Sequence, residues 1–377
     1  MTSLVDSFAD VKDPRVERTR EHPLINLIVI AICGAICGAD SWVEIETFAE
    51  AKKAWLSTYL DLSKGIPSHD TFGRVFARID AEQFQTGFSR WIMGINRKIE
   101  GEGSTEVVAI DGKQLRRSHD KAVGKEAIYM VSAWATEAHL VLGQRKVDEK
   151  SNEITAIPLL LDTLALAGCI VTIDAMGCQK KIAQTIVDQQ ADYVLSLKGN
   201  NGNLYEDTVV MFDYFEKIEF EGVAHTYTRT VNKGHGRVEI RECWSFDPQP
   251  WASYFRTLEE WTTVHSLSMV LAERKIDGVS TIQKRFFISS LVPDSEQILT
   301  AVRSHWGIEN GLHWVLDIAF REDESRIRMG NGAENMAVLR HIAVSLLKQE
   351  RSTKIGIKAK RLKCGWDEEY LLKVLQI

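Results

Sequence analysis

The stretch VVAIDGKQLRRS, residues 107–118, joins an apolar run to a cluster of charges. Its first four residues are apolar and mostly β-branched, which is typical of a buried strand. Asp111 ends this run, and Lys113, Arg116 and Arg117 follow it. Because loops and ligands meet at the ends of strands, the pattern predicts a functional carboxylate. An aspartate before a glycine is also an ordinary turn signal, so this stretch alone leaves the turn interpretation open.

The same pattern recurs in VTIDAMGCQ, residues 171–179, where Asp174 ends a second apolar run. If the two strands are neighbours in a sheet, Asp111 and Asp174 converge at one edge. Two carboxylates at close range repel each other, and a divalent cation removes that cost. Oxygen ligands suit Mg²⁺ or Mn²⁺, and two such ions about 4 Å apart support an in-line displacement at phosphorus. The aspartates therefore predict metal-dependent phosphoryl transfer.

A third acid is expected for such a centre, and the best candidate is Glu309 in RSHWGIENGLHWVLDIAF, residues 303–320. The segment has helical periodicity, and His305 and His313 lie four positions to either side of Glu309, on the same face. Asp317 continues this stripe and is the alternative third acid. A zinc site made by the two histidines and Glu309 is a further alternative, although spacing by four cannot alone bring three ligands round a tetrahedral ion.

Cations near these acids fit a phosphate backbone that approaches a metal-bearing edge. They are Lys113, Arg116, Arg117, Lys198 and Arg303. The chain as a whole has a formal charge of −6, so a nucleic-acid site has to be a local patch. A second basic cluster, KQERSTKIGIKAKRLKCGW at 348–366, could bind phosphates or form a solvated charged face.

Composition indicates a globular protein, with 377 residues of which 45% are hydrophobic and 26% charged. The six cysteines form no CxxC pair and are expected to be reduced packing residues, which predicts a cytoplasmic protein. The apolar stretch LINLIVIAICGAICGA, residues 24–39, is shorter than the roughly 20 residues that span a bilayer. It therefore predicts a buried helix and no membrane partner.

Periodicity divides the chain into four regions and predicts an α/β fold. Residues 1–104 read as helical, 105–199 as strands followed by alternating helices and strands, 200–293 as a β-rich insertion, and 294–377 as a helix that returns to the core and a basic tail. Within the first region, GIPSHDTFGRVFARI at 65–79 has Ser68 as a candidate N-cap. It could belong to a helix-turn-helix that reads DNA through Arg74 and Arg78, or simply to two packed helices.

Taken together, these motifs resemble the DDE transposases of bacterial insertion sequences, in particular the H-repeat-associated group linked to Rhs elements. The resemblance covers nearly the whole chain and several motifs in one order. They are HPLINLIVIAICGAICGADSWVEIETFA, GIPSHDTFGRVF, AIDGKQLRRS, TIDAMGCQ, YVLSLKGNN, HWGIENGLHWVLDIAFRED and AENMAVLRHIAVSLLK.

The resemblance implies an RNase H-like mixed-sheet catalytic core in which Asp111, Asp174 and Glu309 hold two divalent ions, Mg²⁺ or Mn²⁺. It implies a DNA transposase that cuts and joins duplex DNA at terminal inverted repeats and at a target. The amino-terminal helices would bind the DNA ends, and the protein would assemble as a dimer on DNA in the bacterial cytoplasm, near the nucleoid. The alternatives are a nuclease of the same fold without strand transfer, and an inactive, domesticated DNA-binding protein.

One group of residues departs from the pattern of related transposases. The related transposases carry a tyrosine and an arginine before the glutamate and a lysine after it. At these three positions this chain has Val302, His305 and Leu316. We expect Arg303 and Trp306 to supply the cation and the stacking ring from adjacent positions.

Overall fold

The computed structural model describes residues 4–99, 105–119, 124, 126–148, 152–234, 236–277 and 279–375. The chain forms two compact units, each assembled from separate segments. The first unit comprises Met1–Ser104, Gly112–Asn152 and Glu309–Ile377, and the second comprises Thr105–Asp111 and Glu153–Ile308. The boundary that the sequence places at residue 104 falls in 100–104, outside the described residues.

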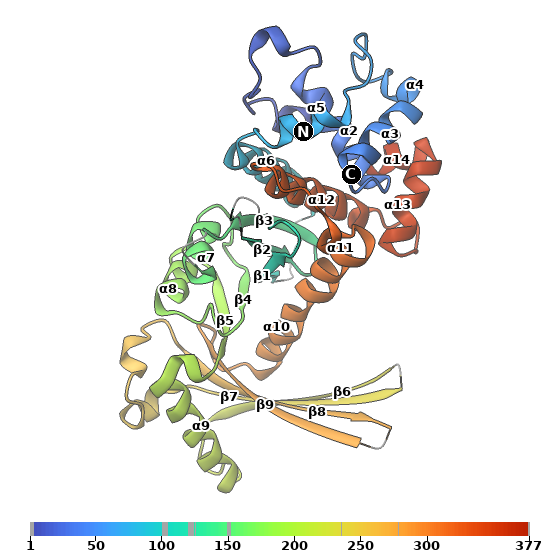
Figure 1. The fold of residues 1–377 in the computed structure, drawn as a ribbon. Coiled ribbons are helices and arrows are strands. Elements are labelled where there is room, and N and C mark those ends of the chain that lie inside the picture. The colour runs from blue at the N-terminus through green and yellow to red at the C-terminus, as the bar shows by residue number, and fades with distance from the viewer. Residues whose placement is uncertain are drawn as a thin grey trace. The chain divides into compact units, whose positions relative to one another are not determined.

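Helices dominate the first unit (Figure 1). They are α1 (Leu4–Ser7), α2 (Leu24–Ile36), α3 (Trp42–Ala51), α4 (Lys53–Leu56), α5 (His69–Phe76), α6 (Ala81–Ile99), α11 (Trp314–Ala319), α12 (Gly332–Gln349), α13 (Ile357–Trp366) and α14 (Glu368–Leu375). Helix α12 is the centre of this unit, because it is buried along nearly its whole length and packs on α2 and α6. The hairpin of β2 (Ile128–Ala135) and β3 (Leu140–Lys146) is antiparallel, and β3 packs on α6 and α12.

The apolar stretch near the amino terminus forms α2, and most of its residues are buried. Its one polar member, Asn26, donates a hydrogen bond from Nδ2 to the Asp61 carbonyl at 2.7 Å, which satisfies a group that would be costly to bury alone. The prediction of a buried helix is confirmed. Among the described residues, no helix is long and apolar enough to cross a membrane.

Side-chain caps fix the starts of α3 and α5. Ser41 and Glu44 form a capping box at α3, and the Ser68 hydroxyl accepts from the Thr71 amide at α5, as expected. Helix α5 buries Phe72 and its neighbours on the same face against Trp42 of α3. This packing is expected for any two helices in contact. It therefore does not distinguish a helix-turn-helix that reads DNA from two packed helices.

The second unit is built on parallel strands. In β1 (Val107–Leu115), β4 (Ile170–Ile173) and β5 (Asp192–Leu197), Ile110 pairs with Ile173 and Ile173 with Leu195. Helix α10 (Ser295–Ile308) lies on one side of β4 and β5, and α7 (Glu153–Leu161) and α8 (Lys180–Asp188) lie on the other (Figure 1). Alternating helices and strands thus add parallel strands to the sheet, as the sequence predicts.

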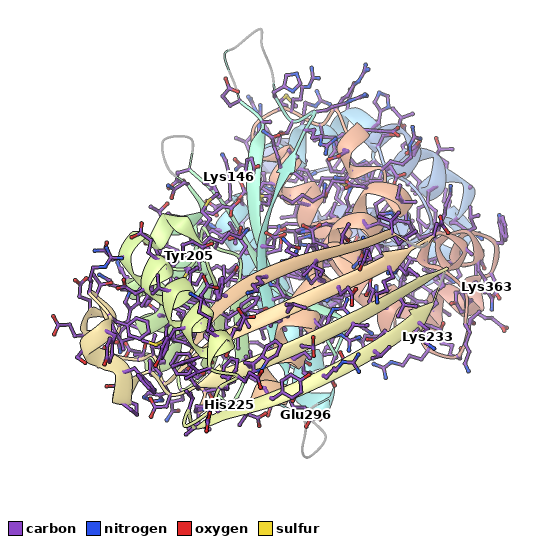
Figure 2. All side chains as sticks on the ribbon, turned by 90° about the horizontal axis from the view of Figure 1, so that it is seen from below. Lys146, Tyr205, His225, Lys233, Glu296 and Lys363 are labelled. Atoms are coloured by element: carbon purple, nitrogen blue, oxygen red, sulfur yellow. The ribbon has the colours of Figure 1, made fainter. Side chains whose placement is uncertain are left out.

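A four-stranded antiparallel ribbon continues the sheet beyond β5. It consists of β6 (His225–Gly234), β7 (Arg237–Phe246), β8 (Ser266–Ile276) and β9 (Val279–Ser289), and α9 (Gly202–Lys217) contacts β9. Figure 2 looks onto this ribbon, with His225 and Lys233 near opposite ends of β6. The β-rich insertion is therefore confirmed.

Hydrogen bonding orders the described strands as β3-β2-β1-β4-β5-β9-β8-β7-β6, which mixes parallel and antiparallel pairs. Three consecutive strands at one edge are followed by two parallel additions. The predicted α/β class, with a mixed sheet, a β-rich insertion and a helical amino-terminal region, is confirmed.

The segment expected as a basic tail is folded into α13 and α14. Lys360 and Arg361 are buried; Lys360 Nζ donates to the Leu347 carbonyl at 2.9 Å, and Arg361 Nε donates to the Ala35 carbonyl at 3.0 Å. These two cations satisfy carbonyls at helix ends inside the first unit, so they do not face a phosphate backbone.

Candidate active site

Asp111 and Asp174 follow paired residues on neighbouring parallel strands. Because Ile110 pairs with Ile173, each aspartate is the residue directly after the paired segment. Asp174 follows the end of β4, as predicted, whereas β1 continues through Asp111 to Leu115, so the prediction that Asp111 ends its strand is wrong. Adjacent strands lie about 4.8 Å apart, so this register brings the two carboxylates into one neighbourhood. The expectation that the two strands are neighbours is confirmed.

The turn after β4 holds the Asp174 carboxylate in one orientation. Its Oδ1 accepts the amide hydrogens of Met176 at 3.0 Å and Gly177 at 3.4 Å, which is an Asx-type turn. A Cβ on Gly177 would lie 2.2 Å from Ile173 Cγ2, so only glycine allows the chain to pass this close to its own strand. Both of these hydrogen bonds end on Oδ1, so the turn also fixes the direction of Oδ2, which is suited to a ligand.

Glu309 begins a π-helical turn, Glu309–His313, directly after α10. Such turns are rare and recur at functional sites, because the extra residue redirects side chains. Gly311 in this turn packs closely on Trp134, since a Cβ there would lie 3.3 Å from Trp134 Cζ2. The Glu309 side chain is 50% exposed, and its Oε2 lies 3.6 Å from Nδ1 of the buried His313.

Possible metal ligands occur in both units. Glu309 and His313 lie together in the first unit, and Asp111 and Asp174 follow paired residues of neighbouring strands in the second. The sequence suggests His313 only as a ligand in the alternative zinc site. Its burial next to Glu309 depends on tertiary packing, which the sequence does not show.

The other acid and histidine of the predicted stripe have different partners. His305 Nδ1 lies 3.1 Å from the Thr172 hydroxyl on β4, and Asp317 accepts a hydrogen bond from Lys113 at 2.7 Å. His305 is thus engaged within the second unit, and Asp317 is engaged by Lys113 within the first.

Lys113 points into a cluster of carboxylates in the first unit. Its Nζ lies 2.7 Å from Asp317, 3.2 Å from Asp323 and 3.3 Å from Glu322, and its side chain is only 12% exposed. Burial alone would lower the pKa of Lys113, but the carboxylates, Glu322 foremost, raise it. The sequence predicted a phosphate contact for this lysine, whereas the structure provides it with three internal partners.

The remaining predicted cations are exposed. Arg116 Nε lies 3.1 Å from Asp323 while its side chain is 74% exposed. Arg117 is exposed beside it, and Lys198 is exposed just beyond the end of β5. Since β5 runs parallel to β4, Lys198 lies at the same edge of the sheet as Asp174.

Helix α10 carries Arg303 and Trp306 on exposed positions. Trp306 is 48% exposed, and the guanidinium of Arg285 on β9 lies 5.4 Å from its ring centre. The sequence did not identify Arg285, because the contact depends on the pairing of the ribbon with the core. Arg285 adds a cation next to the ring that the sequence predicts for stacking.

Two departures from the transposase pattern have a packing explanation. Val302 packs against the core cluster around Val107 and Ile298 in the second unit. Leu316 is 1% exposed, so a lysine at that position would be buried.

Comparison with known proteins identifies the family of the chain. A family model described as "Transposase DDE domain" matches residues 102–346, and one described as "DDE_Tnp_1-associated" matches residues 5–92. The chain is 38% identical to the H repeat-associated putative transposase YhhI of Escherichia coli (strain K12), over 100% of this chain and 98% of that protein. It is 39% identical to the putative transposase YncI of Escherichia coli O157:H7, over 99% and 94%.

Among solved structures, a piggyBac transposase synaptic complex with hairpin DNA matches with a TM-score of 0.40 and 10% identity, over 99% of this chain and 77% of that one. This likeness is too distant to bear on fold or function. The family match and the full-length relatives are sufficient by themselves, and they show that the chain belongs to the DDE transposase family.

Proposed function

We propose that this protein cuts and joins duplex DNA at the ends of an insertion-sequence-like element by metal-dependent phosphoryl transfer. The observation that carries the proposal is the register of β1 and β4, which brings Asp111 and Asp174 to one edge of the sheet. Glu309, at the start of the π-helical turn of the first unit, is the proposed third acid. Membership of the DDE transposase family supports DNA as the substrate.

The donor set fits a hard divalent ion. Asp111 and Glu309 offer carboxylate oxygens, and Asp174 offers another at the end of the neighbouring strand. Such oxygens suit Mg²⁺ and Mn²⁺, and the nitrogen of His313 is a ligand that Mn²⁺ also accepts. Two ions held there would activate the attacking water or 3′-hydroxyl and stabilise the leaving oxygen.

The residues of the chain position the DNA and the ligands. The turn at Met176 and Gly177 orients the Asp174 carboxylate, and the π-helical turn orients Glu309. Lys198, Arg116 and Arg117 would contact phosphates. Arg303 would supply a cation, and the ring of Trp306 would stack on an unstacked base. Lys113 would act by fixing the strand that follows Asp111, because its Nζ is bound to acids of the first unit.

Duplex DNA with terminal inverted repeats is the proposed partner, with a target duplex as the acceptor of the joined ends. Two ends have to be handled together, so we propose a dimer assembled on DNA. The bacterial cytoplasm and its nucleoid are the proposed location.

The test is a cleavage assay with Mg²⁺ or Mn²⁺ on duplexes that carry the repeats flanking the coding region. Wild type and Asp174→Asn are compared, and an acceptor duplex is added to detect joined product. We expect cutting and joining at the repeat boundary by wild type alone.

Each of the other outcomes would indicate a different function or refute the metal site. Cutting without any joined product would indicate a nuclease of the same fold. Repeat binding by both proteins with cutting by neither would indicate a domesticated DNA-binding protein. Full cleavage by Asp174→Asn would refute the proposed metal site.

A further inference from the structure

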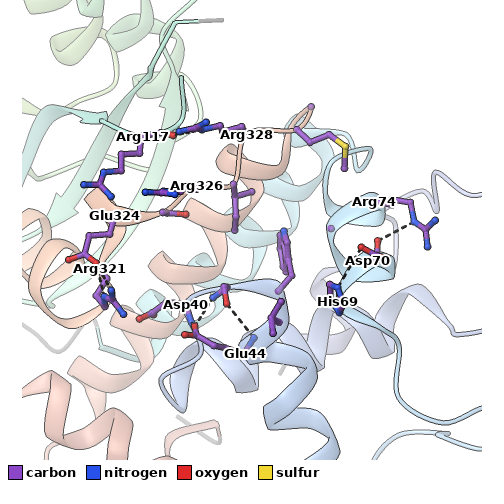
Figure 3. Close-up of a pocket in the computed structure, with 18 residues that line it drawn as sticks. Asp40, Glu44, His69, Asp70, Arg74, Arg117, Arg321, Glu324, Arg326 and Arg328 are labelled. Carbon is purple, nitrogen blue, oxygen red and sulfur yellow. Dashed lines mark hydrogen bonds and ion pairs between the residues drawn. The ribbon is translucent and has the colours of Figure 1, made fainter. Parts of the chain in front are cut away.

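A large hollow in the first unit lies between the start of α3, helix α5 and the segment 321–330 (Figure 3). Every residue that lines it belongs to this unit. Its volume is about 1240 Å³, whereas small-molecule pockets usually enclose roughly 300–1,000 Å³. The hollow is also open to solvent. These dimensions favour a macromolecular occupant over a small ligand.

Five arginines line the hollow, and they come from three separate parts of the chain. They are Arg74, Arg117, Arg321, Arg326 and Arg328. The Arg328 Nε donates to the Arg117 carbonyl at 3.0 Å, which joins residues 211 positions apart in the sequence. Figure 3 shows Arg117, Arg326 and Arg328 at one end of the hollow and Arg74 at another.

The acids of the hollow are largely engaged by other partners. Asp40 is bound by the buried Arg361 at 2.7 Å, and Glu324 accepts a hydrogen bond from Arg321 Nε at 2.9 Å. Glu44 accepts the amide hydrogens of residues 40 and 41 as part of the α3 cap. Asp70, the remaining acid, lies 3.7 Å from His69, and its main-chain carbonyl accepts a hydrogen bond from Arg74 Nε at 3.2 Å. Among the described residues, none of these carboxylates forms an ion pair with Arg74, Arg117 or Arg326.

Three of the arginines keep uncompensated charge. Within the described part of the chain, Arg74, Arg117 and Arg326 form no ion pair, and all three are exposed. Gathering like charges around one hollow costs free energy unless an anion is bound there. Guanidinium groups match phosphate oxygens in bidentate geometry, and a phosphate backbone presents such anions at regular intervals.

We propose that this arginine-lined hollow binds the sugar–phosphate backbone of duplex DNA, through Arg74, Arg117 and Arg326. The inference rests on the proposed function for the identity of the nucleic acid, and it adds a binding site outside the predicted ligand residues. Arg117 follows Asp111 by six positions, so one segment of chain serves both the predicted metal edge and the hollow. The contact is to phosphates, and it therefore acts on any sequence.

The experiment measures binding of the full chain to a fluorescein-labelled duplex of about 30 base pairs with arbitrary sequence, in steps of salt concentration. The variants are Arg74→Gln, Arg117→Gln and Arg326→Gln. The matched control is Arg78→Gln, because Arg78 is exposed, lies one turn beyond Arg74 and does not line the hollow. If this segment instead read DNA as a helix-turn-helix, Arg78 would contribute to binding together with Arg74.

Each hollow variant should lower the slope of log affinity against log salt by about 0.9, because one fewer counterion-releasing contact is made. At 0.1 M salt this corresponds to an affinity loss of about eightfold per arginine. Arg78→Gln should bind like wild type. Unchanged slopes in the three variants, or an equal loss in Arg78→Gln, would overturn the inference.

The same set of proteins separates this inference from the proposed function. Asp174→Asn should keep the wild-type salt slope while it loses cleavage. If wild type cuts no DNA but the three arginine variants still lower the salt dependence of binding, the inference about the hollow is supported and the proposed chemistry is refuted. If wild type cuts DNA and the arginine variants bind normally, the chemistry stands and the hollow is not the site. No binding of duplex DNA by wild type overturns both.

Discussion

Replacing Lys113 by methionine should destabilise the first unit strongly. The methionine fills nearly the same space but lacks the ammonium group. In wild type, Lys113 Nζ lies 2.7 to 3.3 Å from carboxylate oxygens of Asp317, Asp323 and Glu322, and the variant loses all three ion pairs. The Glu322 side chain is 2% exposed, and its other partner, Arg340, lies 3.5 Å away. Removing one member of a buried ion pair costs on the order of 3 kcal/mol, because the remaining charge stays desolvated.

The assay is urea unfolding of wild type, Lys113→Met and two controls, followed by circular dichroism. With a slope of about 3 kcal/mol/M, the midpoint of Lys113→Met should fall by about 1 M. Arg116→Met removes a neighbouring cation that is 74% exposed, and it should cost less than about 1 kcal/mol. Lys113→Arg keeps the charge and should recover part of the loss.

The pH dependence gives a second check on the same cluster. Burial alone would raise the pKa of Glu322, but Arg340 and Lys113 hold that pKa below its ordinary value. Stability from a lowered carboxyl pKa is present above the ordinary value and is lost as pH falls through the folded value. Acidification should therefore cost wild type more stability than Lys113→Met. A Lys113→Met protein that unfolds at the same urea concentration as Arg116→Met would refute this account.

Three further predictions concern single residues. Glu309→Gln should abolish metal-dependent DNA cleavage, whereas Asp317→Asn should mainly lower the urea midpoint, because Asp317 binds Lys113; loss of cleavage in Asp317→Asn at wild-type stability would contradict this. Gly177→Ala should destabilise by about 1–3 kcal/mol, since its Cβ would lie 2.2 Å from an Ile173 atom, and the displaced turn should reduce cleavage; normal thermal stability and activity would argue against it. Burial lowers the pKa of His341 to about 4, so the unfolded chain takes up the proton first and stability should decline as pH falls from 6.5; His341→Leu should flatten this loss in unfolding curves at pH 7 and 5, and an unchanged pH dependence would refute it.

Local patterns were enough to predict both strands and the end of β4 before Asp174, but not the continuation of β1 past Asp111 to Leu115. The runs before Asp111 and Asp174 are apolar and β-branched, and a strand with that composition is buried wherever it lies in the sheet. That the two strands pair in parallel, with Ile110 opposite Ile173, is a long-range property that periodicity does not contain. Periodicity supplied the order of the elements, and the structure supplied the register.

Side-chain partners were the part that the sequence could not provide. Lys113 binds Asp317 and Asp323 across more than 200 positions of the chain. Lys360 and Arg361 likewise looked like tail cations, because a charge run on its own is typical of a solvated face. In both cases burial decides the role of the charge, and burial depends on which distant helix covers it.

The cations that follow Asp111 have three different destinations. Lys113 lies among acids of the first unit, Arg116 pairs with Asp323 at the surface, and Arg117 faces the arginine-lined hollow. A carboxylate needs a fixed backbone if it is to hold an ion, and the Lys113 ion pairs anchor β1 two residues beyond Asp111. Charges that bind the protein itself cannot also bind phosphate, so the proposed DNA contacts fall to the exposed members of the segment. The proposed ligand Asp111 and the anchoring Lys113 both lie in β1, and the proposed phosphate contact Arg117 lies just beyond its end.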